Sequence, residues 1–181
     1  VPLRSERIGP MSLPHQARAR GWTARRPAPQ YRLPGEFDHH DALLLSCDEL
    51  TSDHPDLLAA IIGAAKERIS IVAIVSDRDA RQRTVELLEH NALPADRVHL
   101  LDLPHDSMWI RDYGPFAVRD REGRIVIVDA RYNQSLGRGH DDDVPVAIAE
   151  LLGTKLVQAP VYLDGGNLLS NGGGLCLSTT S

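Results

Sequence analysis

Aromatic residues and lysine are scarce in this chain of 181 residues, so the few that occur deserve to be located. Only 4% of the residues are Phe, Trp or Tyr, and the tryptophans are Trp22 and Trp109. The only lysines are Lys66 and Lys155, against a total of 20 basic residues. Coding bias explains the excess of arginine, which therefore carries no functional argument.

Cysteine and long apolar runs are equally scarce. Two cysteines, Cys47 and Cys176, are too few for a disulfide framework and lack zinc-ligand spacing. One disulfide between them stays open, and Cys176, flanked by leucines, is expected to be a small core side chain. The longest apolar run, Ile69–Val75, has the length of a strand, far below the roughly 18 residues of a membrane span. No membrane partner is expected, and a cytoplasmic location is slightly favoured over export.

Positive charge gathers at the N-terminal end. Residues 1–34 hold seven arginines, one glutamate and six prolines, a local charge of +6 within a total of −5, which leaves −11 on the rest. The absence of an apolar period predicts an extended Arg/Pro-rich arm over residues 1–34. The acidic remainder, residues 35–181, argues against nucleic-acid binding and mildly favours a cationic ligand.

From residue 35 onward, segments typical of strands and helices alternate. Strands are predicted at 41–46, 69–75, 98–101 and 156–157, and helices at about 53–68, 77–90 and 141–152. Hairpins are predicted at 116–128 and 168–177. Polar loops at 104–115 and 162–167 precede the two hairpins. This order of elements indicates an α/β protein.

The two loops and their hairpins repeat one another. Aligning Asp112-Tyr-Gly with Asp164-Gly-Gly, 52 residues later, also superposes the hairpins that follow. The unit is ββαβ, and each unit delivers one polar loop. In a closed ring of such units the loops would meet at the axis, so the carboxylates of Asp112 and Asp164 would face a common pocket.

Trp109 and Asp112 form the first candidate binding pair. An indole face beside a carboxylate suits a planar cation, because both attract positive charge and a guanidinium can form two hydrogen bonds. The more common alternative is a tryptophan in the core and an aspartate that caps a turn. Asp164 is either a second site carboxylate or a turn residue, with Gly165 and Gly166 needed for positive φ or for close backbone approach.

Other candidate motifs favour structural roles. Residues 171–174, Asn-Gly-Gly-Gly, join two strands and lack the helix and Lys-Ser/Thr pair of a phosphate loop, so a hairpin turn is predicted. Neither His39-His40-Asp41 nor His105-Asp106 makes a convincing metal site, because neighbouring residues of a strand point to opposite faces. The carboxylates of Asp141, Asp142 and Asp143 are expected to satisfy N–H groups at the start of a helix. No metal or cofactor is expected.

Four segments together resemble the agmatine deiminase family, which includes the Porphyromonas-type peptidylarginine deiminases. They are Asp106-Ser-Met-Trp-Ile-Arg-Asp-Tyr-Gly-Pro115, Val128-Asp-Ala-Arg-Tyr-Asn133, Leu163-Asp-Gly-Gly-Asn-Leu-Leu-Ser-Asn-Gly172 and Ser178-Thr-Thr180. Leu33-Pro-Gly-Glu-Phe-Asp38 is similar to the start of that family. The resemblance implies a pentein, an α/β propeller of five units, of which this chain would supply the N-terminal half.

The resemblance also implies a chemistry. In the family a thiolate attacks the carbon of a guanidinium, a histidine moves protons, and two carboxylates hold the nitrogens, giving a ureido product and ammonia. By matched position, Asp112 and Asp164 are the predicted catalytic carboxylates, and Trp109 and Asn167 line the substrate pocket. The implied substrate is agmatine or another small guanidinium cation, with no cofactor.

The chain departs from the family in its catalytic set. No histidine follows His140, so the His-x-Asp motif is absent, and Cys176 does not match the family's nucleophile. The peptidylarginine members' arginine clamp is not matched plainly, although Arg131 or Arg138 could replace it, and Arg138 is kept as a candidate. The chain alone is therefore expected to be inactive and to need a second chain or a missing C-terminal segment. The alternative is an inactive pentein module that binds guanidinium compounds or a protein.

Overall fold

The computed structural model describes residues 30–132 and 137–179, so the predicted arm lies almost wholly outside the described residues. The first part of the chain contains β1 (Ala42–Ser46), α1 (Asp48–Asp53), α2 (Pro55–Ala65), β2 (Ser70–Val75), α3 (Arg78–His90) and β3 (Val98–Asp102). Then follow α4 (Ile110–Tyr113), β4 (Phe116–Arg119), β5 (Ile125–Arg131), α5 (Gly139–Leu151), β6 (Lys155–Tyr162), β7 (Leu168–Ser170) and β8 (Cys176–Ser178). Short 3₁₀ turns, η1 (Ala95–Arg97) and η3 (Gly165–Asn167), precede β3 and β7.

The first sheet is parallel and covered on both faces. Its strands lie in the order β1-β2-β3, with Ala42 opposite Ser70 and Ile71 opposite Val98. One core cluster joins the sheet to α1, α2 and α3, and includes the fully buried Leu58. A second cluster packs Ile74 against side chains of α4 and α5. Double coverage explains why β2 is a continuous β-branched run, as the sequence predicted.

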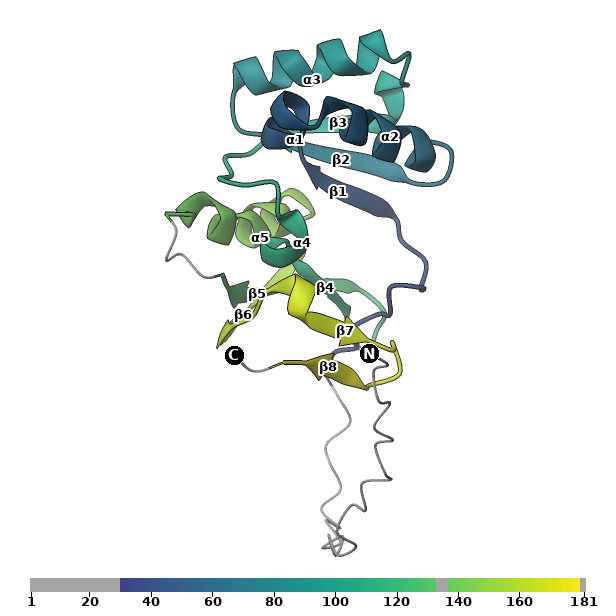
Figure 1. Cartoon of the computed structure of the whole chain (residues 1–181). Coiled ribbons are helices and arrows are strands. Elements are labelled where there is room, and N and C mark those ends of the chain that lie inside the picture. The colour runs from purple at the N-terminus through teal and green to yellow at the C-terminus, as the bar shows by residue number, and fades with distance from the viewer. Residues whose placement is uncertain (1–29, 133–136, 180–181) are drawn as a thin grey trace, which may run out of the picture.

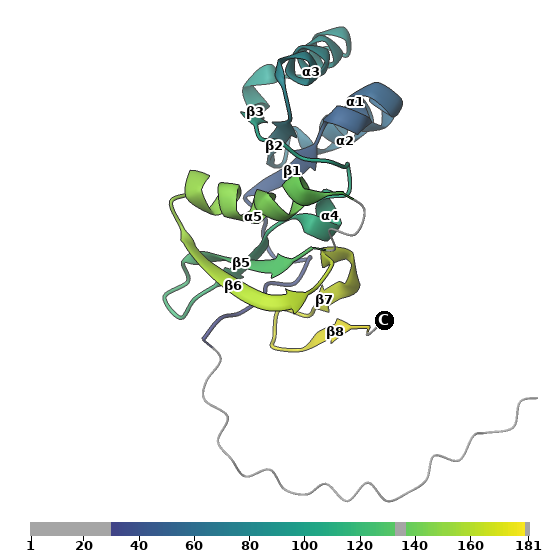
Figure 2. The same ribbon diagram turned by 90° about the vertical axis from the view of Figure 1, so that its left-hand side faces the viewer.

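The second sheet contains the predicted repeat unit. β4 and β5 form an antiparallel hairpin, α5 crosses over, and β6 returns parallel to β5. Figure 2 shows α5 lying across β5 and β6. β7 and β8 begin a further unit as a separate two-stranded sheet, with Leu169 opposite Leu177. The ββαβ order is confirmed, whereas the parallel first sheet does not follow it.

The N-terminal segment ties these parts together. Arg32 exchanges backbone hydrogen bonds with Arg119 of β4, at 2.8 and 2.9 Å, and its guanidinium binds the carboxylate of Asp38 and the carbonyl of Gly172. The hydroxyl of Ser170 donates to the carbonyl of Leu33 at 3.0 Å. Residues 32–38 therefore run between β4 and the turn of the β7–β8 hairpin (Figure 1).

Several predicted boundaries were wrong for identifiable reasons. The helix expected over 53–68 is α2, which begins at Pro55, because proline fits the first helical position, and ends at Ala65. The short helix α1 before it was not predicted. The loop 104–115 contains the single turn α4. Helix α5 begins at Gly139, so its three aspartates lie inside its first turns, and β6 extends to Tyr162. By contrast, the helix predicted over 77–90 is confirmed as α3, and Asp77 caps it by accepting from the N–H of Ala80 at 2.7 Å.

Candidate functional site

The candidate site is built on the one-turn helix α4. Trp109 is the residue immediately before this turn, and it is 49% exposed. Asp112 lies in the turn itself and is half-buried. The N–H of Asp112 donates to the carbonyl of Trp109 at 2.8 Å, and Gly114 closes the turn by donating to Ile110 at 2.8 Å. The structure therefore places Trp109 at the surface rather than in the core, three residues before Asp112.

The two polar loops meet, as the repeat predicted. The N–H of Gly166, in the second loop, donates to Oδ1 of Asp112 at 3.0 Å. A Cβ at Gly165 would lie 2.1 Å from the carbonyl oxygen of Arg111, and one at Gly166 would lie 2.3 Å from Oδ1 of Asp112. Neither glycine is among those with positive φ. Of the two expected reasons for this Gly-Gly pair, close approach is the one that applies.

The other candidates of the second loop have different surroundings. Asp164 precedes η3 with an exposed side chain that caps no N–H group of that turn. The amide of Asn167 binds Thr179 with both its ends: Nδ2 donates to the carbonyl at 2.9 Å, while Oδ1 accepts from the hydroxyl at 2.7 Å and the N–H at 3.1 Å. Asp164 is thus exposed at the surface, while Asn167 anchors the end of β8.

Arg138 lies at the start of α5, away from the second loop in sequence but close to other polar groups. Its Nη1 donates to the phenolic oxygen of the buried Tyr132 at 3.1 Å. This hydrogen bond raises the pKa of Arg138, and the charges of Asp141 and Glu49 act in the same direction. The neighbouring residues 133–136, where the family's clamp would begin, lie outside the described part of the chain.

Carboxylates of α1 and α5 hold the loop that leads into α4. Oδ1 of Asp141 accepts the N–H groups of Asp106 and Ser107 at 2.8 and 3.2 Å, and its Oδ2 accepts the Ser107 hydroxyl at 2.7 Å. Glu49 Oε2 accepts the N–H of Met108 at 3.1 Å. The expectation that the Asp141 carboxylate satisfies its own helix was wrong, since this side chain points out of the helix to a loop that needs acceptors.

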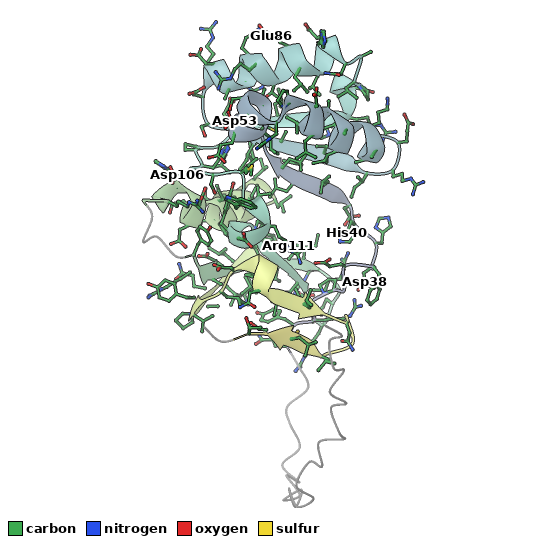
Figure 3. The ribbon with its side chains drawn as sticks, in the orientation of Figure 1. Asp38, His40, Asp53, Glu86, Asp106 and Arg111 are labelled. Atoms are coloured by element: carbon green, nitrogen blue, oxygen red, sulfur yellow. The ribbon has the colours of Figure 1, made fainter. Side chains whose placement is uncertain are left out.

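His140 of α5 and Asp106 of the loop form a further contact between these two segments. Asp106 accepts from the backbone N–H of His140 at 2.8 Å and contacts its Nδ1 at 2.9 Å. The hydrogen bond that the His140 ring makes to the Asp106 carboxylate raises the pKa of His140. For Asp106, desolvation acts against the shift, but the hydrogen bonds of His140 lower the pKa. Figure 3 shows Asp106 beside α5, while Arg111 lies at α4 and pairs with Glu36.

A second polar cluster lies at the carboxyl ends of the first sheet. The ring of His105, with a side chain only 2% exposed, has Nδ1 3.0 Å from the carbonyl of Leu103 and 3.2 Å from Oγ of Ser76. Because a nitrogen facing a carbonyl must carry hydrogen, it cannot take a proton from Ser76. Nε2 lies 3.7 Å from Asp48 Oδ2, beyond hydrogen-bond distance. Ser76, His105 and Asp48 are the residue types of a catalytic triad, but their geometry does not form one. We therefore assign these three residues a structural role.

The thiols give no nucleophile–base pair in the described residues. Cys47 is fully buried behind β1, and burial raises its pKa to about 12. Cys176 is free and exposed on β8, so the expectation of a core cysteine was wrong, because no described element covers that hairpin. Cys47 is also free, so the disulfide left open is not formed.

The described residues contain neither a metal-binding cluster nor a membrane-spanning helix. No three His, Cys, Asp or Glu side chains within 30–132 and 137–179 are grouped so that they could hold a metal ion. Over the same residues, no helix has the length and apolar character needed to cross a bilayer.

Sequence reasoning missed the residues that hold the first loop. The sequence predicts Asp141 only as a helix-start residue, and it gives no reason to select Glu49 or Ser107 as candidates. The one available signal is the run Asp141-Asp142-Asp143, which has more carboxylates than one helix start needs. The loop residues that Asp141 and Glu49 bind lie 34 and 59 positions away from them, and such separations leave no periodic trace in a sequence.

Solved structures define the class of protein. Agmatine deiminase of Enterococcus faecalis matches with a TM-score of 0.68 at 21% identity, covering 82% of this chain and 43% of that one. C. jejuni agmatine deiminase matches with a TM-score of 0.65 at 18% identity, covering 82% and 45%. The fold is thus that of the pentein proteins, of which the described residues form an open part and not a closed barrel.

The family follows from the sequence match. Residues 32–181 match the family of Porphyromonas-type peptidyl-arginine deiminase, and the chain belongs to this family. A Streptomyces avermitilis protein provisionally described as an agmatine deiminase is 28% identical over 162 residues, which cover 82% of this chain and 45% of the relative. A Photobacterium profundum relative with the same description is 25% identical over 164 residues, covering 82% and 43%. The chain spans less than half the length of these relatives.

Proposed function

We propose that this chain is the guanidinium-binding part of a hydrolase that converts agmatine, or a related arginine-like cation, to a ureido product and ammonia. The observation that carries the proposal is the hydrogen bond from Gly166 of the second loop to the carboxylate of Asp112, which lies three residues after the exposed Trp109. Family membership and the agmatine deiminase relatives support it.

The side chains of this chain would bind and orient the substrate. The indole of Trp109 offers a π face, and the carboxylate of Asp112 has one oxygen fixed by Gly166 and a second that can accept from a guanidinium N–H. Asp164, exposed at the adjacent loop, would supply a second carboxylate. Two carboxylates would fix the planar group so that its central carbon faces an attacking thiolate.

We propose that later units of the propeller supply the attacking thiolate and the histidine. No histidine follows Asp141 in the sequence, and the only later cysteine, Cys176, is exposed on an edge strand. Those units would belong to a longer polypeptide or to a second chain, and would cover the exposed leucines of the β7–β8 hairpin. Residues 35–181 would then be the N-terminal part of one pentein domain.

The binding proposal is tested by titrating the chain with agmatine in a calorimeter. Asp112→Asn should weaken binding about tenfold or more, because it removes a charge-assisted hydrogen bond. Asp56→Asn, which removes an exposed carboxylate from α2, is the matched control and should bind as the unmodified chain does. Equal affinity of the two variants would contradict the site assignment.

The incompleteness proposal has its own assay. The purified chain is incubated with agmatine or with peptidyl-arginine, and ureido groups are measured colorimetrically. We expect binding without product. Ureido product that scales with the amount of chain would show that this chain carries its own nucleophile. Absence of both binding and product would favour the alternative of an inactive module that binds a protein.

A further inference from the structure

Three consecutive peptide groups ahead of α4 are held by carboxylates from two different helices. The N–H groups of Asp106 and Ser107 donate to Asp141 of α5, and that of Met108 donates to Glu49 of α1. Four residues after Met108 the chain reaches Asp112. The backbone of the loop that leads to the candidate site is therefore held by hydrogen bonds to side chains of two helices.

Asp141 is the most constrained member of this arrangement. Its side chain is 0% exposed, and none of the ion pairs formed by the described residues includes it. A buried carboxylate without a paired cation must be satisfied by hydrogen bonds, and here the loop supplies three. Moving the loop would leave a charge unsatisfied in the interior, so the carboxylate resists displacement of residues 106–107.

Ser107 passes this constraint to both ends of the α4 turn. Its hydroxyl, which binds Asp141, lies 3.5 Å from the N–H of Trp109, and its carbonyl accepts from the phenol of Tyr113 at 2.8 Å. Tyr113 is buried directly after Asp112 and packs against Tyr132, with ring centroids 5.8 Å apart. Ser107 thus contacts Trp109 itself and Tyr113, the residue directly after Asp112.

We propose that Asp141 is a positioning residue, which acts through Ser107 to fix the directions of Trp109 and Asp112. The assignment of a guanidinium site rests on the proposed function, whereas the ordering of Trp109 does not. Asp141 touches no substrate in this arrangement. It orders the pair before a ligand arrives, so less ordering has to accompany binding.

Fluorescence of Trp109 tests the ordering directly. In the 181-residue chain carrying Trp22→Phe, Trp109 is the sole tryptophan. Asp141→Ala in this background should increase acrylamide quenching and lower the anisotropy of Trp109. Ser107→Ala, which keeps the two backbone bonds, should have a smaller effect of the same sign. Asp141→Asn keeps an acceptor oxygen and should restore most of the ordering. Asp143→Ala, an exposed aspartate of the same helix, is the control.

Agmatine titration of the same proteins tests the functional consequence. Asp141→Ala should lose about tenfold in affinity, and Asp141→Asn should recover most of it. If Asp141→Ala does not fold by circular dichroism, Ser107→Ala and Asp141→Asn decide the question. Quenching and anisotropy of Trp109 equal to those of Asp143→Ala would overturn the proposal. If no protein binds agmatine but quenching changes as expected, the proposed function fails while the positioning role stands.

Discussion

At the scale of single residues, the site depends on how closely two backbone segments approach. Gly165 and Gly166 pass so near to Arg111 and Asp112 that no side chain fits between them. A hydrogen bond from Gly166 then fixes one oxygen of the Asp112 carboxylate. The Gly-Gly pair was visible in the sequence, but the partner that requires it was not.

Gly166→Ala should therefore destabilise the chain by about 1–3 kcal/mol, because overpacking forces the two loops apart. The free energy of unfolding from urea titration measures the effect. Gly139→Ala is the matched control, since a Cβ there meets nothing within 4 Å and the residue begins a helix. Gly139→Ala should be neutral or slightly stabilising, because alanine favours helix. A Gly166→Ala protein as stable as this control would mean that the loops do not meet.

At the scale of secondary-structure elements, α5 is the part shared by both sheets. It crosses between β5 and β6, and its residues Val144 and Ile148 pack with Ile74 of the first sheet. Its first turn holds the site loop through Asp141 and through the pair of His140 with Asp106. The sequence predicted that α5 is a helix. It did not predict that α5 holds the loop of the candidate site.

The His140–Asp106 pair predicts a pH dependence. The raised pKa of His140 means that its contribution is complete below the unfolded pKa, about 6.5, and is lost as pH rises through the folded value. The lowered pKa of Asp106 means that the carboxylate contribution is lost as pH falls through its folded value. Between these limits both groups are charged.

Melting temperatures of the unmodified chain and His140→Ala should thus differ most near pH 5.5 and converge by pH 8.5. The effect is small, because both side chains are in contact with solvent and screened. His40→Ala, which removes an exposed histidine before β1, is the control and should show no such convergence. A His140→Ala difference that grows toward pH 8.5 would contradict the assigned direction.

At the scale of the whole molecule, one hairpin is left without cover by the described residues. Leu169, Leu175 and Leu177 are 55%, 57% and 61% exposed. Leu169 faces Leu177 across the β7–β8 pair, and Leu175 shares a face with Leu177 by alternation. We call these three leucines the hairpin face. A two-stranded hairpin gains little stability alone, so such a face fits an interface with further propeller units.

The hairpin face should bind an apolar dye. Leu169→Glu with Leu177→Glu should reduce the fluorescence of anilinonaphthalene sulfonate with the chain by about half, because these side chains form most of the face. Leu57→Glu, at a comparably exposed leucine of α2, is the control and should change it little. An equal loss with Leu57→Glu would show that dye binding is not specific to the hairpin.

The sequence by itself determined the type and order of most elements, the repeat offset and the family, because these rest on local periodicity and on a specific motif around Trp109 and Asp112. It also predicted that the two Asp-containing loops meet. Only the tertiary structure decided which carboxylates hold those loops. Asp141 and Ser107 lie 34 residues apart and come together because α5 packs between two sheets. The exposure of Cys176 was also decided by the tertiary structure. Whether this side chain is buried depends on the elements that pack against β8, and not on the leucines next to it in the sequence.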